Sequence, residues 1–208
     1  MKTKSLDIFK VDQYEIECCH GLLVPSVTEF VAKAYYNRKD FHFNITLEKL
    51  IEKLLLEDIA YIKDSYVFTV YDKMHNILGT IRMIIKTENN ILPIEREFDI
   101  DLSQIQSEAE GKFFEVARMA VEPANMYILR LLIDQVLKNF HKQDIALASL
   151  DIRVLKRLRT LKLPWVDFGN SKVYLGSITC PVYLRINSII EYPQDIYKET
   201  ISYRDELS

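Results

Sequence analysis

The side chains best suited to chemistry are one carboxylate and two guanidinium groups. Glu115 and Arg118 lie three residues apart in the apolar run FFEVARMAV, and Arg82 lies in the run ILGTIRMI. A carboxylate can act as a general base, and arginine can hold a carboxylate or lactone-type oxygen by forked hydrogen bonds. Side chains alternate along a regular strand, so Glu115 and Arg118 share a site only if the strand bulges. The alternatives are a paired structural carboxylate and arginines at a strand edge or on the surface.

The elements that would position these groups begin with two helices. Pro25 and Ser26 introduce a helix that runs to about Tyr36, and Thr46 can cap a second helix. The apolar residues of the second helix fall on one face: Leu47, Leu50, Ile51, Leu54 and Leu55. Residues 1–65 are therefore expected to be mainly helical.

The core is expected at residues 66–190 and begins with a hairpin around the polar segment Asp72 to Asn76. A strand over 113–121, a helix over 126–140 and a strand over 145–150 predict a parallel pair joined by a right-handed crossover. A basic helix and the closing strands follow, and the charged tail is expected to be peripheral: residues 152–161, 172–177, 181–189 and 191–208.

Composition bounds the class of protein. The 208 residues, of which 49% are hydrophobic and 27% charged, predict a single globular domain. A formal net charge of −3 offers no basic field for nucleic acid. No window has the roughly 18 apolar residues of a membrane-spanning helix, and the amino terminus lacks the apolar stretch of a signal peptide. We therefore expect no membrane span and a cytoplasmic location.

Metal and thiol chemistry have little support in the sequence. The four histidines are scattered without the spacing of metal ligands: His20, His42, His75 and His141. The three cysteines include the adjacent Cys18 and Cys19 and suit neither a disulfide framework nor a zinc site. We expect no metal and reduced, incidental thiols.

Four stretches in order resemble the GNAT superfamily of N-acyltransferases, and more closely its autoinducer (acyl-homoserine-lactone) synthases and long-chain N-acyl amino acid synthases. ILGTIRMI resembles the Gly-x-x-Arg end of a hairpin strand, and FFEVARMAV resembles the Glu-x-x-Arg central strand. LPIEREF lies between them, and WVDFG with VYLGSITCPVYLRI resembles the closing strands. The resemblance covers roughly Tyr66 to Ile190 and implies an α/β fold, with a mixed, splayed central sheet flanked by helices.

The resemblance implies roles for the residues. A bulge on the central strand would re-aim its side chains and separate it from its parallel neighbour, which admits the acyl donor. Glu115 would then orient or deprotonate an amine, and Arg82 and Arg118 would bind the acceptor. Backbone N–H groups near Ala120 or Val121 would stabilise the tetrahedral oxyanion.

The donor site departs from the common acetyltransferase pattern. The glycine-rich turn that cradles coenzyme A is replaced by Glu122-Pro123-Ala124-Asn125, so only the helix-start amides at Ala124 and Asn125 remain to receive an anion. No cofactor is expected to bind tightly, and the donor is acyl-CoA or acyl carrier protein. Carrier protein is acidic and suits the basic positions Arg153, Lys156 and Arg157, which otherwise form a solvated face. The tyrosine that serves as general acid in many relatives is missing from residues 158–163.

Three functions remain open. The first is transfer of a fatty acyl group to an amine, such as an amino acid or a derivative of one. The second is a small-group N-acetyltransferase that uses acetyl-CoA. The third is a non-catalytic GNAT-like module that binds an acyl ligand or a protein, which the missing glycines and tyrosine favour.

Overall fold

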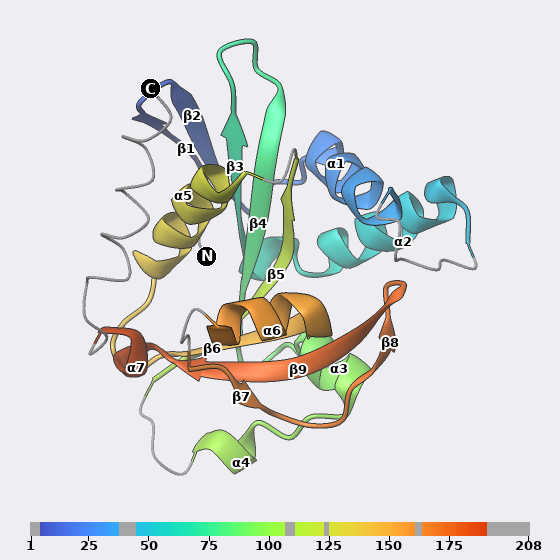
Figure 1. Cartoon of the computed structure of the whole chain (residues 1–208), viewed down its shortest axis with the longest axis vertical. Helices are drawn as coiled ribbons and strands as arrows, with labels where there is room; N and C mark the ends of the chain where they lie inside the picture. Colours follow the sequence, from blue (N-terminus) through green and yellow to red (C-terminus); the bar gives the residue numbers. More distant parts are fainter. Residues whose placement is uncertain (1–4, 38–44, 107–110, 123–124, 161–163, 191–208) are drawn as a thin grey trace.

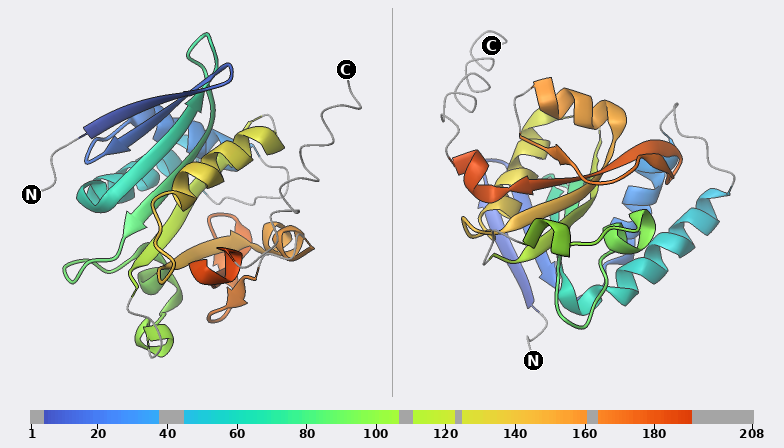
Figure 2. Two further views of the ribbon diagram at one scale, coloured as in Figure 1. Left: turned by 90° about the vertical axis from the view of Figure 1, so that its left-hand side faces the viewer. Right: turned by 90° about the horizontal axis from the view of Figure 1, so that it is seen from below.

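The computed structural model describes residues 5–37, 45–106, 111–122, 125–160 and 164–190, which form one sheet with helices on both faces (Figures 1 and 2). The sheet has nine strands in the order β1-β2-β3-β4-β5-β6-β9-β7, and β8 pairs with β9. The strands are β1 Ser5–Val11, β2 Tyr14–His20, β3 Ser65–Tyr71, β4 Ile77–Ile85, β5 Phe113–Val121, β6 Ile145–Asp151, β7 Val166–Asp167, β8 Lys172–Tyr174 and β9 Ser177–Arg185. This mixed sheet confirms the predicted fold class.

The helices begin where local chemistry favours a start. Pro25 occupies the first turn of α1, Thr46 accepts a hydrogen bond from the Lys49 amide at the start of α2, and Asn125 caps α5. The helices are α1 Pro25–Tyr36, α2 Leu47–Ala60, the 3₁₀ turn η1 Ile62–Asp64, α3 Pro93–Phe98, α4 Ser103–Gln106, α5 Met126–Leu137, α6 Ile152–Thr160 and α7 Ile186–Ile190. The predicted α1, α2, α5 and α6 are all present.

A hairpin at the amino terminus was not predicted. Strands β1 and β2 pair antiparallel from Ser5–His20 to Val11–Tyr14, across a turn in which Asp12 has a φ of 55°. The prediction of a mainly helical region over 1–65 is therefore wrong for residues 5–20. Helices α3 and α4, which lie between β4 and β5, were also not predicted.

Among the described strands, β5 and β6 form the one parallel pair, as predicted, with α5 as the crossover. In Figure 1 β3, β4 and β5 run roughly vertically, whereas β6 and β9 cross below them. The sheet therefore changes direction sharply between β5 and β6.

The two faces of the sheet have separate cores. On one face α5 packs Ile128, Leu131 and Leu132 against β3 and β4, and α6 packs Leu155 against β6 and β9. On the other face α1 and α2 pack against β5, and α3 packs against β6. Leu175, at the turn between β8 and β9, also contacts this second core beside α1 and α2, with a φ of 45°.

The tail predicted to be peripheral, residues 191–208, lies outside the described residues. No helix in the described part of the chain is both long enough and apolar enough to cross a membrane.

Gly79 of β4 lies directly under α5. A Cβ atom at this position would lie 2.9 Å from Ile128 Cγ2 and 3.2 Å from both Leu132 Cδ1 and the Ala120 carbonyl oxygen. The lack of a side chain therefore lets α5 approach the sheet.

We predict that Gly79→Ala lowers the free energy of unfolding by about 1–3 kcal/mol, because the methyl group forces α5 away from β4. Met74→Ala, at the exposed tip of the same hairpin, is the control and should change it by less than about 0.5 kcal/mol. Urea denaturation measures both, and equal values for the two variants would contradict the prediction.

Candidate functional site

Arg82 and Arg118 meet a pair of carboxylates at the end of α2. Arg82 donates from Nη2 to Glu57 Oε1 at 2.8 Å and from Nη1 to Asp58 Oδ1. Arg118 donates from Nη2 to Glu57 Oε1 at 2.9 Å and from Nε to Asp58 Oδ1 at 3.3 Å. Arg82 is 2% exposed and Arg118 8% exposed, and Glu57 and Asp58 are partly buried, so these four side chains form a largely buried ion-pair cluster.

A β-bulge brings Arg118 into this cluster. Thr80 pairs with Ala120 but Arg82 pairs with Ala117, so β5 has one more residue than β4 in this interval. Arg118 lies inside the interval with a φ of 56°, a left-handed conformation that is uncommon for a residue with a side chain. The bulge that the resemblance implied is therefore present, and it turns Arg118 to the face that carries Arg82.

The cluster is balanced by further polar contacts. Thr28 of α1 donates to Asp58 Oδ2 at 2.7 Å, and Arg96 Nη2 of α3 lies 3.6 Å from Glu57 Oε2. Burial raises the pKa of Glu57, but the Arg118 and Arg82 guanidinium groups outweigh it and hold that pKa below its ordinary value. Glu57 is therefore ionised, and both arginines are already engaged by the chain itself. Their predicted contact with an acceptor stays a prediction, and it requires those ion pairs to exchange.

Glu115 lies on the same face, beside the cluster. Its side chain is 3% exposed and accepts a hydrogen bond from the Ile94 amide at the start of α3, at 2.9 Å. Burial raises its pKa to about 7, although the Ile94 hydrogen bond and Arg82 act to lower it. Glu115 therefore exchanges a proton near neutral pH.

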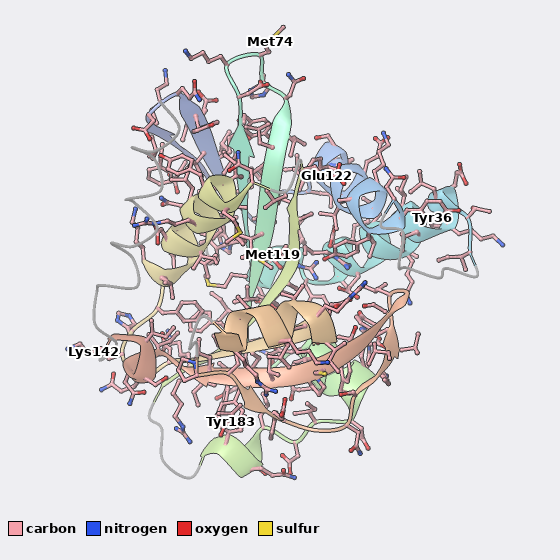
Figure 3. The ribbon with its side chains drawn as sticks, viewed as in Figure 1. Tyr36, Met74, Met119, Glu122, Lys142 and Tyr183 are labelled. Atoms are coloured by element: carbon pink, nitrogen blue, oxygen red, sulfur yellow. The ribbon has the colours of Figure 1, made fainter. Side chains whose placement is uncertain are left out.

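The strands separate one residue beyond Glu115. Pairing between β5 and β6 runs from Phe113–Ile145 to Val116–Ala148 and ends there. From Ala117 onward β5 continues to pair with β4, while β6 continues to pair with β9 up to Asp151. The predicted separation of β5 from its parallel neighbour is therefore present as a V-shaped opening between the two backbones, and Met119 lies on the part of β5 that borders it (Figure 3).

Backbone groups on this part of β5 have no partner on β6, because the pairing ends at Val116. Ala120 and Val121, the predicted oxyanion donors, lie here, and Ala120 is completely buried against the α1 and α2 side. The opening is thus bordered by the two predicted positions, whose roles stay predictions.

A small pocket reaches the ion-pair cluster from the amino-terminal end of α1. Its walls include the side chains of Arg82, Arg118 and Asp58 together with Leu23 and Val27. Its volume of about 30 Å³ is enough for a water molecule. Arg82 Nε is buried and has no hydrogen-bond partner among the described residues, so it is a donor that water in this pocket can satisfy.

The predicted anion site at the start of α5 is occupied in part by its own cap. Asn125 Oδ1 accepts from the Tyr127 amide at 2.9 Å and from the Ile128 amide at 3.4 Å. Ala124 lies outside the described residues. Two of the helix-start amides are therefore already satisfied by Asn125.

The basic face of α6 is present at the surface. Arg153 and Lys156 are exposed, and Leu155 between them is buried against β6 and β9. Arg153 also pairs with Asp151 at 2.9 Å, and nothing is described for the Arg157 side chain. The predicted docking positions therefore lie on the face of the sheet that α5 also covers.

One group of described residues brings three potential metal ligands within 4.8 Å of one another: Glu15 and Glu17 of β2 and His75 of the β3–β4 turn. In sheet order β2 is three strands from β5, which carries Glu115. No step proposed below uses this group.

Glu57 and Asp58 are the site residues that the sequence analysis missed. Asp58 follows Leu47, Ile51 and Leu54 at helix spacing, so an acid interrupts the apolar stripe of α2. An acid at such a position is expected to have a buried partner. That interruption was the available signal.

Comparison with known proteins bears on the fold. No known family and no curated protein matches the sequence. The structure of FeeM, an N-acyl amino acid synthase from uncultured soil microbes, is similar with a TM-score of 0.59 and 15% identity, over 88% of this chain and 91% of that chain. The chain has the GNAT fold.

Acetyltransferase structures are also matched, at lower similarity. A spermidine/spermine N-acetyltransferase from Vibrio cholerae gives a TM-score of 0.49 and 15% identity, over 86% of this chain and 96% of that chain. A ribosomal-protein-S5-alanine acetyltransferase from Vibrio fischeri gives a TM-score of 0.46 and 18% identity, over 85% of this chain and 94% of that chain. Only the likeness to FeeM bears on the fold, and at 15% identity it does not bear on the substrate.

We predict that Arg82→Met destabilises the protein by about 3–5 kcal/mol, because Glu57 and Asp58 then lose a buried counter-charge. Lys33→Met, which removes one partner of the exposed Lys33–Glu29 pair, should cost less than about 0.5 kcal/mol. Chemical denaturation of both variants measures the difference, and a cost for Arg82→Met as small as the control would show that the cluster does not stabilise the fold.

Proposed function

We propose that the chain is a GNAT-type N-acyltransferase. It moves a fatty acyl group from an acyl carrier protein or acyl-CoA thioester to an amine such as an amino acid or a derivative of one. The observation that carries the proposal is the opening between β5 and β6, which begins one residue beyond Glu115. An opening of this kind can admit the extended arm of a thioester. The shared fold of an N-acyl amino acid synthase supports the same reaction.

Glu115 is the proposed base. An amine must lose its proton before its lone pair can attack a thioester carbonyl, and a base works best when its pKa lies near the working pH. The pKa of Glu115, raised by burial to about 7, meets that condition. Because Glu115 is 3% exposed, the proton reaches it directly in an opened site or through a bridging water.

The acyl carbon passes through a tetrahedral oxyanion, and backbone N–H groups near Ala120 or Val121 are the proposed donors to it. Glu115 takes the proton of the ammonium form, the nitrogen–carbon bond then forms and the carbon–sulfur bond breaks, and the second nitrogen proton passes through water to the departing thiolate. A thiol has a pKa near 8.5, so the thiolate can leave without a general acid and take its proton from water.

The proposed donor carries its acyl group as a thioester on its own extended arm, so the reaction needs no tightly bound cofactor. Acyl carrier protein is the preferred form, because Arg153 and Lys156 of α6 are exposed and Arg157 follows them at helix spacing. Opposite charges of this kind speed encounter and fix orientation.

One observation favours a second candidate, a non-catalytic module that binds an acyl ligand or a protein. Arg82 and Arg118 are both engaged by Glu57 and Asp58, and Glu115 receives the Ile94 amide. Such a closed cluster is also what a purely structural role would produce. Activity assays separate the two candidates.

We predict that Glu115→Gln lowers N-acylation by about 10²–10⁴-fold, because the base is lost while the side-chain shape is kept. Mass spectrometry of lipid extracts from cells producing the wild-type protein identifies the N-acyl product, and assays with that substrate pair measure the loss. In the wild type kcat/KM should rise with pH through about 7, because only ionised Glu115 accepts a proton.

Glu52→Gln, an exposed position on α2, is the control for the charge change and should keep full activity. Circular dichroism and thermal unfolding establish that Glu115→Gln is folded. Unchanged turnover in a folded Glu115→Gln protein would remove Glu115 from the mechanism. No transfer by the wild type from any thioester, with saturable binding to a partner, would select the non-catalytic module.

We predict that the double variant Arg153→Glu, Lys156→Glu raises KM for acyl carrier protein by about tenfold or more at low salt and leaves KM for the matching acyl-CoA within about twofold. The reversed charges repel the acidic carrier but do not touch the thioester arm. Added salt should shrink the difference, because it screens exposed charges. An equal rise for both donors would argue against docking on α6.

A further inference from the structure

Trp165, the single tryptophan of the chain, lies on the α5 and α6 face of the sheet. It packs against two apolar clusters, one that contains Ala148 of β6 and Leu155 of α6, and one that contains Ala146 of β6 together with Phe140 beyond α5. It therefore joins the cluster under α6 to the cluster beside the end of α5.

The indole N–H of Trp165 has no partner among the residues that the structure describes. Nε1 is shielded from solvent and makes no hydrogen bond with any residue that the structure describes. Buried donors of this kind are rare, because a polar group removed from water and left unpaired is costly. Indole nitrogen only donates, so the missing partner must be an acceptor.

Trp165 also lies close to the point where the sheet opens. Val116 is the last residue of β5 that pairs with β6, opposite Ala148, and it packs against the same cluster as Trp165. An arm that enters the opening from the α5 and α6 face, next to the basic residues of α6, passes along Val116 and Ala148. Val116 is half-buried, so this cluster reaches the surface at the opening.

We propose that Trp165 is a donor-binding residue whose Nε1–H donates to a carbonyl oxygen of the pantetheine arm of the acyl donor. The inference rests on the proposed function, because it assumes a thioester donor. Pantetheine is an extended chain with two amide carbonyls, and coenzyme A and acyl carrier protein both carry it. Binding brings an amide carbonyl of the arm to Nε1 and pairs this donor.

The test uses the tryptophan as its own probe. Decanoyl-CoA and decanoyl-acyl carrier protein are titrated into the wild-type protein while tryptophan emission is recorded, and calorimetry measures binding independently. We expect a saturable change in emission whose midpoint equals the calorimetric Kd for each donor. Calorimetric binding with unchanged emission would place the arm away from Trp165 and overturn the inference.

Trp165→Phe keeps an aromatic ring but removes the N–H. We expect its Kd and KM for both donors to rise roughly tenfold, with kcat at saturating donor within about twofold of the wild type. The matched control is Phe140→Leu, which removes a ring from the same cluster but no hydrogen-bond donor, and it should leave donor KM within about twofold.

Three results overturn the inference while the proposed function stands. They are an unchanged donor KM in active Trp165→Phe, an equal rise in Trp165→Phe and Phe140→Leu, and a rise for decanoyl-CoA alone, which would place the contact on the nucleotide. If the wild type binds and transfers from no thioester, the proposed function fails and the inference fails with it.

Discussion

The arrangement of this protein depends on burying two arginines and two acids together. An isolated charge inside a protein is heavily penalised, so Arg82 and Arg118 remain in the core only because Glu57 and Asp58 are there to meet them. The two acids lie on α2 and the two arginines on β4 and β5. The cluster therefore fixes how α2 lies on the sheet, and Thr28 adds α1 to the same network.

The bulge at Arg118 links this electrostatic requirement to the geometry of the sheet. One extra residue in β5 turns Arg118 toward the acids and disturbs the strand immediately beyond Val116, where β5 parts from β6. A single local irregularity thus accompanies both the charge cluster and the opening. Glu115 precedes the bulge, so its main chain stays paired with both neighbouring strands while its carboxyl group lies beside the charge cluster.

The sequence predicted those parts of the fold that depend on local patterns. Thr46 and Pro25 marked helix starts, the polar turn from Asp72 to Asn76 marked a hairpin, and the order of strand, helix and strand indicated the parallel pair. The β1–β2 hairpin was missed although Leu6 and Ile8 alternate with polar residues before a turn at Asp12, because Phe9 directly after Ile8 breaks that alternation.

The site was predicted less completely, for a physical reason. Residue type and spacing identified Glu115, Arg82 and Arg118. Their partners are distant in the sequence, so spacing alone does not identify them. Asp58 interrupts an apolar stripe and so signals a buried partner, yet only the tertiary structure shows that the partner is an arginine pair. The Ile94 amide at Glu115 and the unpaired N–H of Trp165 likewise depend on three-dimensional packing.

Leu175 gives the diverging sheet a second point of attachment. The β8–β9 hairpin extends from the β6 side of the sheet, and its tip packs into the core beneath α1 and α2, which belong to the β5 side (Figure 1). Backbone hydrogen bonds thus hold β5 and β6 together up to Val116, and the contact of Leu175 with the α1 and α2 core holds the two sides together farther along. The contact of Leu175 with the α1 and α2 core therefore restricts how far β9 can move away from β5.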